Sequence, residues 1–162
     1  MLARVLALSF ALGAGTPAKR LDLGWLLPST WVIDPREGPD LTAHAPGDPL
    51  TFLIVVHTDT TTPVNATELK RQIETSRKHG FGPTAAAIGT CSDRHGRFPC
   101  SETVEAKANG TSVSYAWLDT KSKRNFAAVY SAPSGRQDEL LPRLRQMVGW
   151  KLKSTIDLAS IH

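Results

Sequence analysis

Two runs of alternating apolar and polar residues, separated by Asn109-Gly110, limit what this chain can fold into more than any other feature. The runs cover residues 103–108 and 111–118. Successive side chains of a strand point to opposite faces of a sheet, so each run predicts a strand with one buried face. Asn-Gly is the dipeptide that most strongly favours a two-residue hairpin turn. The pattern therefore predicts antiparallel β structure.

Strand patterns continue on both sides of this hairpin. After a polar turn, residues 125–131 alternate again, which extends the hairpin to a three-stranded meander. Residues 50–57 (LTFLIVVH) are a β-branched apolar run bounded by turn residues. Such a run predicts a central strand covered on both faces. Between residues 24 and 49, short apolar islands separated by Pro, Gly and Asp predict short edge strands.

Two segments have helical periodicity. Asn65 and Glu68 form a variant capping box, and Gly80 stands where a helix C-terminus favours glycine, so residues 66–79 predict a helix. An apolar stripe predicts a second helix at residues 138–152. The expected fold is α+β: an antiparallel sheet of about five to seven strands, with a C-terminal three-strand meander, flanked by two main helices in an α/β/α-like sandwich.

Residues 1–18 (MLARVLALSFALGAGTPA) predict a secretory signal peptide. Arg4 precedes an apolar run, and small residues follow. The run is shorter than the ~20 apolar residues that a membrane span needs, so we expect no span and export to the periplasm or the extracellular space. The alternative is a first strand or helix of the fold. After the signal peptide we expect one α+β domain at residues 19–153 and a C-terminal tail at 154–162.

The chain has two cysteines, Cys91 and Cys100, at the ends of the segment CSDRHGRFPC. In an exported protein, an even and closely spaced pair predicts a disulfide bond. The alternative is a metal site that uses both cysteines and His95. A structural zinc site takes four ligands and usually a C-x2–4-C pair, so this segment fits a disulfide better and we expect no metal.

The segment between the cysteines carries three cationic side chains, Arg94, His95 and Arg97. Loops held by a rigid frame often carry binding residues, so these three are candidates for contact with an acidic partner; the alternative is a solvated turn. The net charge of +4 is spread along the chain without a cluster of like charges. We therefore expect a protein partner and no nucleic acid.

The order of these elements resembles a known arrangement. The residues that carry the resemblance are Leu27-Pro28-Ser29-Thr30-Trp31, the strand at 50–57, the helix at 66–79, the hairpin across Asn109-Gly110 and a final helix closing at 148–152. Together they are similar to the PsbP/Mog1-like superfamily, which includes small exported bacterial domains. The resemblance rests on element order and spans most of the chain. It implies a non-enzymatic accessory or binding domain with no cofactor, and it carries over no catalytic residue.

His57 and Asp59, at the end of the predicted central strand, are the most enzyme-like pair. They project on the same face of an extended chain, and His44 on a neighbouring strand could add a second histidine for a cation. The segment VVHTDTTT also faintly resembles the histidine-bearing strand of zinc-dependent peptidoglycan amidases. The alternative function is therefore a hydrolase or metal-binding protein centred here. Since no G-x-S-x-G, P-loop or H-E-x-x-H motif is present, we favour surface recognition without catalysis.

Overall fold

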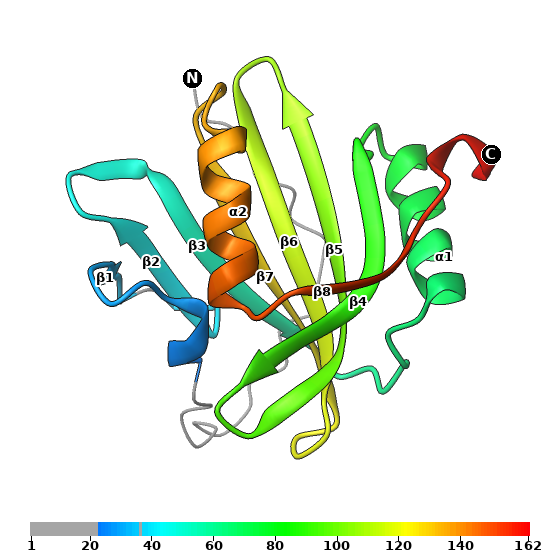
Figure 1. Ribbon diagram of the computed structural model, residues 1–162, viewed down its shortest axis with the longest axis horizontal. Helices are drawn as coiled ribbons and strands as arrows, with labels where there is room; N and C mark the ends of the chain where they lie inside the picture. Colours follow the sequence, from blue (N-terminus) through cyan, green and yellow to red (C-terminus); the bar gives the residue numbers. More distant parts are fainter. Residues whose placement is uncertain (1–22, 36) are drawn as a thin grey trace.

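The computed structural model describes residues 23–35 and 37–162, and its main element is an eight-stranded sheet in which neighbouring strands are antiparallel (Figure 1). The order of strands is β1-β2-β3-β7-β6-β5-β4-β8. The strands are β1 (Val32–Ile33), β2 (Leu41–Ala45), β3 (Asp48–Thr58), β4 (Ala85–Asp93), β5 (Gly96–Lys107), β6 (Gly110–Asp119), β7 (Arg124–Ala132) and β8 (Lys151–Thr155). The count exceeds the predicted range because β8 was not expected. The predicted signal peptide, residues 1–18, lies outside the described residues.

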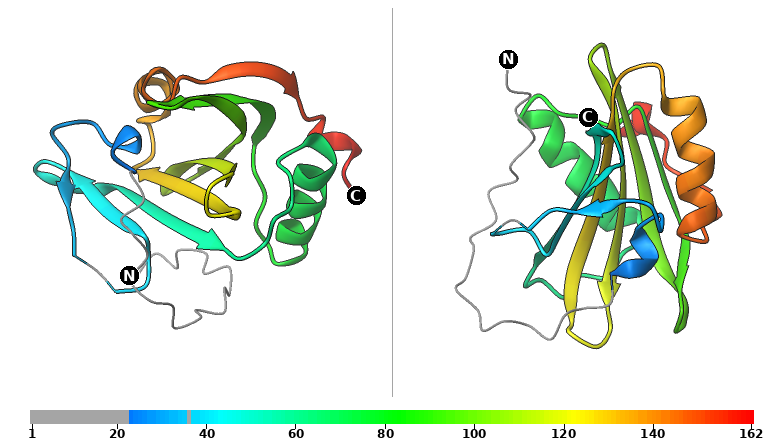
Figure 2. Two further views of the ribbon diagram at one scale, coloured as in Figure 1. Left: turned by 90° about the horizontal axis from the view of Figure 1, so that it is seen from below. Right: turned by 90° about the vertical axis from the view of Figure 1, so that its left-hand side faces the viewer.

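Two α-helices flank this sheet. Helix α1 (Ala66–Lys78) links β3 to β4, and α2 (Gln137–Met147) links β7 to β8. The right-hand panel of Figure 2 shows the two helices on opposite sides of the sheet. The predicted α+β class and the flanked antiparallel sheet are thereby confirmed. Among the described residues, no helix is long and apolar enough to cross a membrane.

The predicted meander is formed by β5, β6 and β7. The alternation has the expected effect: Val113, Tyr115 and Trp117 are buried on one face of β6. The turn, however, lies one residue earlier than Asn109-Gly110, because Lys107 pairs with Gly110 and leaves Ala108-Asn109 as the two turn residues. Neither turn residue has a positive φ, so the hairpin does not use the turn type that Asn-Gly favours.

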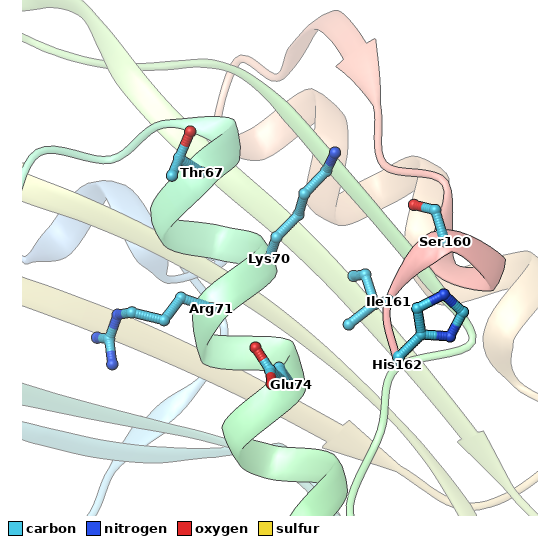
Figure 3. A pocket seen from close by; sticks show the side chains of 7 residues that line it. All are labelled: Thr67, Lys70, Arg71, Glu74, Ser160, Ile161 and His162. Atoms are coloured by element: carbon cyan, nitrogen blue, oxygen red, sulfur yellow. The ribbon is translucent and has the colours of Figure 1, made fainter.

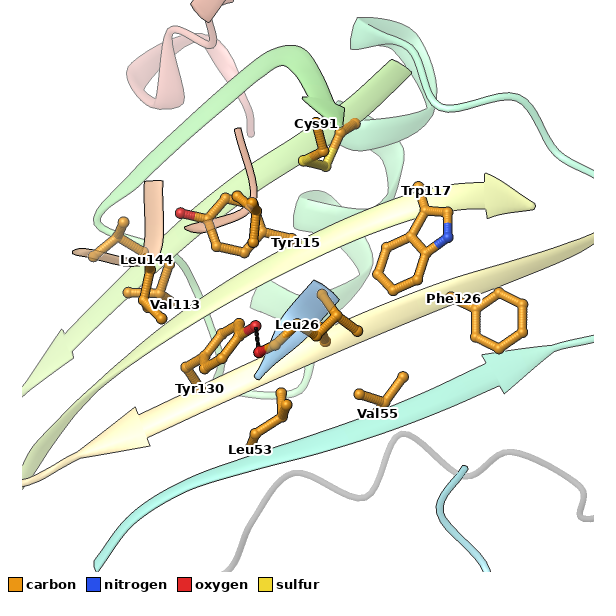
Figure 4. Close-up of a cluster of buried hydrophobic side chains, with 14 residues drawn as sticks. Leu26, Leu53, Val55, Cys91, Val113, Tyr115, Trp117, Phe126, Tyr130 and Leu144 are labelled. Atoms are coloured by element: carbon orange, nitrogen blue, oxygen red, sulfur yellow. Dashed lines mark hydrogen bonds between the residues drawn. A yellow bond between two sulfur atoms is a disulfide. The ribbon is translucent and has the colours of Figure 1, made fainter. Parts of the chain in front are cut away.

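One face of the sheet packs against α2 and the short helix η1 (Gly24–Leu26) to form the main core (Figure 4). The buried members of the main core are Leu26, Leu53, Val55, Cys91, Cys100, Val104, Val113, Tyr115, Trp117, Phe126, Ala128, Tyr130, Leu144 and Val148. The Tyr130 hydroxyl donates a hydrogen bond of 2.6 Å to the Leu26 carbonyl oxygen. This bond satisfies a buried phenol and fastens η1 to the centre of the sheet.

Aromatic rings fill much of the main core. Trp117 stacks on Phe126 at 5.5 Å between ring centroids, and Trp25 meets Trp117 edge to face at 5.1 Å. Trp25 also contacts Phe98 at 5.5 Å, which joins the segment before β1 to the β4–β5 hairpin. Such offset and edge-to-face contacts are the favourable geometries for aromatic pairs. They join η1, β5, β6 and β7 in one continuous core.

The other face of the sheet packs against α1 at the β4 end. Leu69 and Ile73 of α1 contact Ala86, Ile88 and Ile156 in a second, smaller core. The helix begins as predicted, because the Glu68 amide donates a hydrogen bond of 2.9 Å to the Asn65 side chain. It ends at Lys78, one residue before the predicted end. The strong helix signal in the sequence is therefore confirmed.

The second predicted helix is wrong at its C-terminal end. Helix α2 starts at Gln137 and ends at Met147, and residues 151–155 form β8 instead of continuing the helix. Gly149 has a φ of +62°, which favours glycine, and a Cβ there would collide with the Ser92 side chain. The chain therefore leaves the helix at Gly149 and pairs with β4.

The C-terminal residues after β8 lie against α1. Ile156 is 7% exposed, and its amide donates a hydrogen bond of 2.8 Å to the Ala86 carbonyl oxygen. Arg77 of α1 donates a hydrogen bond of 2.6 Å to the Ile161 carbonyl oxygen. Residues 154–162, which we expected to be a tail, thus contain the end of β8, a buried isoleucine and the short helix η2 (Leu158–Ser160).

We expect Gly89→Ala to detach β8. A Cβ at residue 89 would collide with the Lys151 carbonyl oxygen and lie 2.9 Å from the Trp150 ring. Overpacking of this kind costs about 1–3 kcal/mol, so the free energy of unfolding should fall by that amount. Hydrogen exchange of the amides of residues 151–155 should speed up. Gly82→Ala is the control, because its nearest neighbour is Arg77 Cγ at 3.4 Å. Unchanged exchange in β8 of Gly89→Ala would contradict this close packing.

Candidate binding surface

The β4–β5 hairpin carries Arg94 and His95 at its tip and Arg97 within β5, next to the tip. Asp93 pairs with Gly96, so Arg94 and His95 are the two turn residues. The Asp93 side chain accepts a hydrogen bond of 2.7 Å from the His95 amide. The predicted disulfide between Cys91 and Cys100 is present and buried in the main core, with 5.5 Å between the two Cα atoms. The bond and the core together fix the position of the tip.

The side chains of Arg94, His95 and Arg97 have different surroundings. Arg97 Nη1 donates hydrogen bonds of 2.9 Å to Thr90 Oγ1 and 2.7 Å to the Gly149 carbonyl oxygen. Arg97 therefore ties the hairpin to the turn that follows α2. Arg94 and His95 are exposed, and Arg94 Nε lies 3.0 Å from His95 Nε2. Their role in binding stays a prediction.

Strand β8 adds cationic side chains beside this hairpin. It is the last strand of the sheet, and all five of its residues are exposed. Lys151 pairs with Thr90, the residue that Arg97 contacts. Within residues 23–35 and 37–162, the side chains of Lys151 and Lys153 form no ion pair or hydrogen bond. We call Arg94, His95, Arg97, Lys151 and Lys153 the cationic edge.

A cavity of about 250 Å³ lies between β8, β4, β5 and α2. The residues that line it are Ala85, Ala86, Ala87, Glu102, Arg145, Trp150, Leu152 and Thr155. We call it the Glu102 cavity, because Glu102 is the buried charge in its wall, with 3% of the residue exposed. Sequence reasoning missed Glu102, although it shares the strand face of Val104 and Cys100, both of which are buried.

Glu102 is paired from two sides. The Tyr115 hydroxyl donates a hydrogen bond of 2.8 Å to Glu102 Oε2, and Arg145 Nη2 donates one of 2.7 Å to Oε1. The hydrogen bonds to Glu102 raise the pKa of Arg145. Burial, followed by the charge of Glu102, raises the pKa of Tyr115 far above its ordinary value. Tyr115 therefore stays a hydrogen-bond donor, and a carboxylate so fully paired is a poor general base.

His57 and Asp59 come together through a third residue. His57 Nδ1 lies 2.7 Å from Asp40 Oδ2, and Arg124 Nη1 lies 3.5 Å from His57 Nε2. Arg124 Nε also forms an ion pair of 3.0 Å with Asp59. Sequence reasoning missed Asp40 and Arg124, which are distant in the chain. The cluster is a set of polar contacts that joins the end of β3 to β7 and to the residue before β2.

His44 does not join this cluster. It pairs with Phe52 in the sheet, whereas His57 lies five residues further along β3 and faces the other side. His44 Nδ1 instead lies 2.8 Å from Asp34 Oδ2, within hydrogen-bond distance. Among the described residues, no three His, Cys, Asp or Glu side chains are grouped so that they could hold a metal ion. Neither described cavity includes His57.

A second cavity, of about 450 Å³, lies between α1 and the C-terminal residues (Figure 3). It is lined by Thr67, Lys70, Arg71, Glu74, Ser160, Ile161 and His162. Figure 3 shows the side chains of α1 on one side and those of residues 160–162 on the other. Arg71 is already bound to Glu68 at 2.8 Å through Nε, so the two ends of this ion pair neutralise each other. The lining offers no buried charge that could orient a ligand.

The fold has a counterpart among solved structures. The chain is similar to the solution structure of cyanobacterial PsbP from Synechocystis sp. PCC 6803, with a TM-score of 0.50 and 12% sequence identity. The match covers 78% of this chain and 84% of that chain. No protein-family model and no curated protein matches the sequence. The chain therefore has a PsbP-like fold, as its order of elements predicted.

We expect the free energy of unfolding to fall as the pH rises above about 10. Burial raises the pKa of Tyr115 and of Tyr130, so both keep their protons when folded and lose them when unfolded. Their contribution is complete below the unfolded pKa and is lost above it, at about 1.4 kcal/mol per pH unit for each tyrosine. Denaturant unfolding followed by circular dichroism between pH 9 and about 11.5 measures the slope.

Tyr115→Phe removes one of these two contributions. The free energy of unfolding of this variant should therefore fall with pH about half as steeply as that of the unchanged protein. The comparison is made after subtracting the contribution of the other titrating groups, which both proteins share. Tyr130→Phe is the matched comparison, since it removes the other buried phenol. Equal slopes in all three proteins would contradict burial of the two hydroxyls.

Proposed function

We propose that this protein is an exported, non-catalytic binding protein that recognises an acidic partner protein through the cationic edge. The observation that carries the proposal is the position of Lys151 and Lys153 on β8, which pairs with residues 87–90 of the strand that leads to the hairpin tip. Neither lysine has an acidic partner within the described part of the chain. Charges of one sign gathered on a surface favour a partner of opposite charge and speed its encounter.

The frame around the cationic edge supports recognition. The disulfide joins Cys91 and Cys100, which are nine positions apart in the sequence, across the hairpin, and Arg97 links the hairpin to Gly149 ahead of β8. A surface whose backbone is already ordered loses less conformational entropy on binding than a mobile loop. The hairpin and β8 can therefore meet a partner as one preformed unit.

Export is the second element of the proposal. A disulfide persists in oxidising compartments, and the sequence of residues 1–18 has the pattern of a secretory signal peptide. We infer a single α+β domain after that peptide, located in the periplasm or the extracellular space. The accessory role that the PsbP/Mog1-like resemblance implies fits a component of an envelope or extracellular assembly.

The state of the enzyme-like residues favours binding over catalysis. His57 is hydrogen-bonded to Asp40 and lies within hydrogen-bond distance of Arg124, and Arg124 forms an ion pair with Asp59. Glu102 is likewise paired with Arg145 and Tyr115. A nucleophile or general base needs a free acceptor atom next to a space for substrate, and the described part of the chain pairs these groups instead.

Charge reversal on β8 tests the recognition surface. We expect Lys151→Glu/Lys153→Glu to lower recovery of a salt-sensitive partner by about tenfold or more when the tagged chain is purified from its own compartment. Both residues are exposed, so the fold should stay unchanged by circular dichroism. The control Lys70→Glu/Lys121→Glu changes the charge equally at other exposed positions and should leave recovery unchanged. Equal recovery from both double variants would overturn the proposed surface.

Processing tests the proposed export. We expect the protein recovered from its host to begin near residue 19 and to lie outside the cytoplasm. Intact mass analysis before and after reduction should show the gain of the hydrogens of one disulfide, with no thiol available for alkylation beforehand. Recovery of the chain in the cytoplasm with residues 1–18 attached and both cysteines reduced would contradict export.

A further inference from the structure

The Glu102 cavity has apolar walls that open beside the cationic edge. Trp150 immediately precedes β8, Leu152 lies in β8, and Ala85 and Ala87 come from β4. Leu152 is 60% exposed, although most large apolar side chains of the chain lie in one of the two cores. Exposed apolar surface next to a cavity is typical of a place where a ligand or partner side chain binds.

One donor in this cavity is not used by the fold. Arg145 binds Glu102 through Nε and Nη2, at 3.0 and 2.7 Å. Within the described residues, Arg145 Nη1 has no partner, and 46% of the side chain is exposed. Guanidinium groups bind carboxylates well because they offer several donors in a fixed plane. Glu102 holds that plane in position from behind, and both of its oxygens are occupied.

The charge around the cavity selects the sign of the ligand. Glu102 and Arg145 neutralise each other, and within residues 23–35 and 37–162 the side chains of Lys151 and Lys153, which flank Leu152 in β8, form no ion pair. Tyr115, the remaining polar contact of Glu102, is a neutral donor. Lys151 and Lys153 therefore add positive charge to the strand that carries Leu152, and this charge favours binding of an anion over binding of a cation.

We propose that the Glu102 cavity is an anchor pocket for a carboxylate carried next to an apolar or aromatic group. The carboxylate binds Arg145 Nη1, and the apolar group lies against Trp150 and Leu152. At about 250 Å³ the cavity is smaller than the ~300–1,000 Å³ of sites for larger ligands, so it takes one side-chain-sized group. This inference rests on the proposed function, since it supplies the contact that holds the acidic partner at the cationic edge.

Three probes of equal length test the pocket: 3-phenylpropionate, 3-phenylpropan-1-ol and 3-phenylpropylamine. They share the ring and differ in the charge of the end group. In two-dimensional NMR titrations, we expect the carboxylate to shift the Trp150 indole and the Arg145 signals with an affinity in about the millimolar range. The alcohol and the amine should bind at least about tenfold more weakly than the carboxylate. Tighter binding of the amine, or shifts confined to residues outside the cavity, would overturn the pocket.

Leu152→Glu places a competing carboxylate at the rim of the cavity. We expect this substitution to lower the affinity for 3-phenylpropionate by about tenfold or more, because the new carboxylate both repels the probe and can bind Arg145 itself. Leu50→Glu is the control: Leu50 is 66% exposed and lies on β3, so the same change there should leave binding unchanged. We avoid substitution of Arg145, since its loss would leave the buried Glu102 charge unpaired and destabilise the fold. Equal affinity in the two variants would contradict the assignment.

A competition experiment separates this inference from the proposed function. Excess 3-phenylpropionate should release the partner captured by the unchanged protein, whereas the alcohol should not. Release by neither compound would overturn the anchor role, and the Lys151→Glu/Lys153→Glu comparison would still decide whether the cationic edge binds a partner. Failure of that charge-reversal test together with NMR binding of the carboxylate would mean a site for a free small carboxylate and would also overturn the anchor role.

Discussion

The buried pair of Glu102 and Arg145 is the interaction that links the sheet to the surface that we propose for recognition. A carboxylate on the packed face of β5 is stable only when it is paired, and the partner comes from the last turns of α2. Helix α2 must therefore lie across the sheet at this point and end nearby. Its end at Met147 directs the chain through Gly149 into β8, which completes both the cationic edge and the Glu102 cavity.

Local patterns in the sequence were sufficient to predict most of the fold. Alternation identified the meander, Asn65 and Gly80 marked the ends of α1, and the spacing of Cys91 and Cys100 predicted the disulfide. The final helix was extended too far, because Trp150 and Leu152 continue its apolar stripe although they belong to the segment that pairs with β4. Only pairing with the distant strand β4 distinguishes a longer helix from a strand in this segment, and that pairing cannot be predicted from a single sequence.

The sequence indicated several residues of the candidate sites, but it did not indicate which other residues they contact. Arg94 and His95 lie at an exposed hairpin tip as expected, but Arg97 is used to hold β8. The partners of His57 are Asp40 and Arg124, which the pairing of β3 with β7 and the turn before β2 bring together. Glu102 was overlooked, although its position two residues before Val104 places it on the buried face of β5. A charged residue in phase with buried neighbours is a signal that sequence reasoning can use.

The pairing of β4 with β8 also has a kinetic consequence. The hairpin of β4 and β5 closes a short loop and can form early, whereas Lys151 must find Thr90 across the intervening meander and α2. Contacts of such large sequence separation form late, because the entropy of closing the long loop is lost before the contact is gained. Chains that have not finished folding therefore lack half of the surface that we assign to recognition. An assembly that selects its component through this edge would admit only chains whose folding is complete.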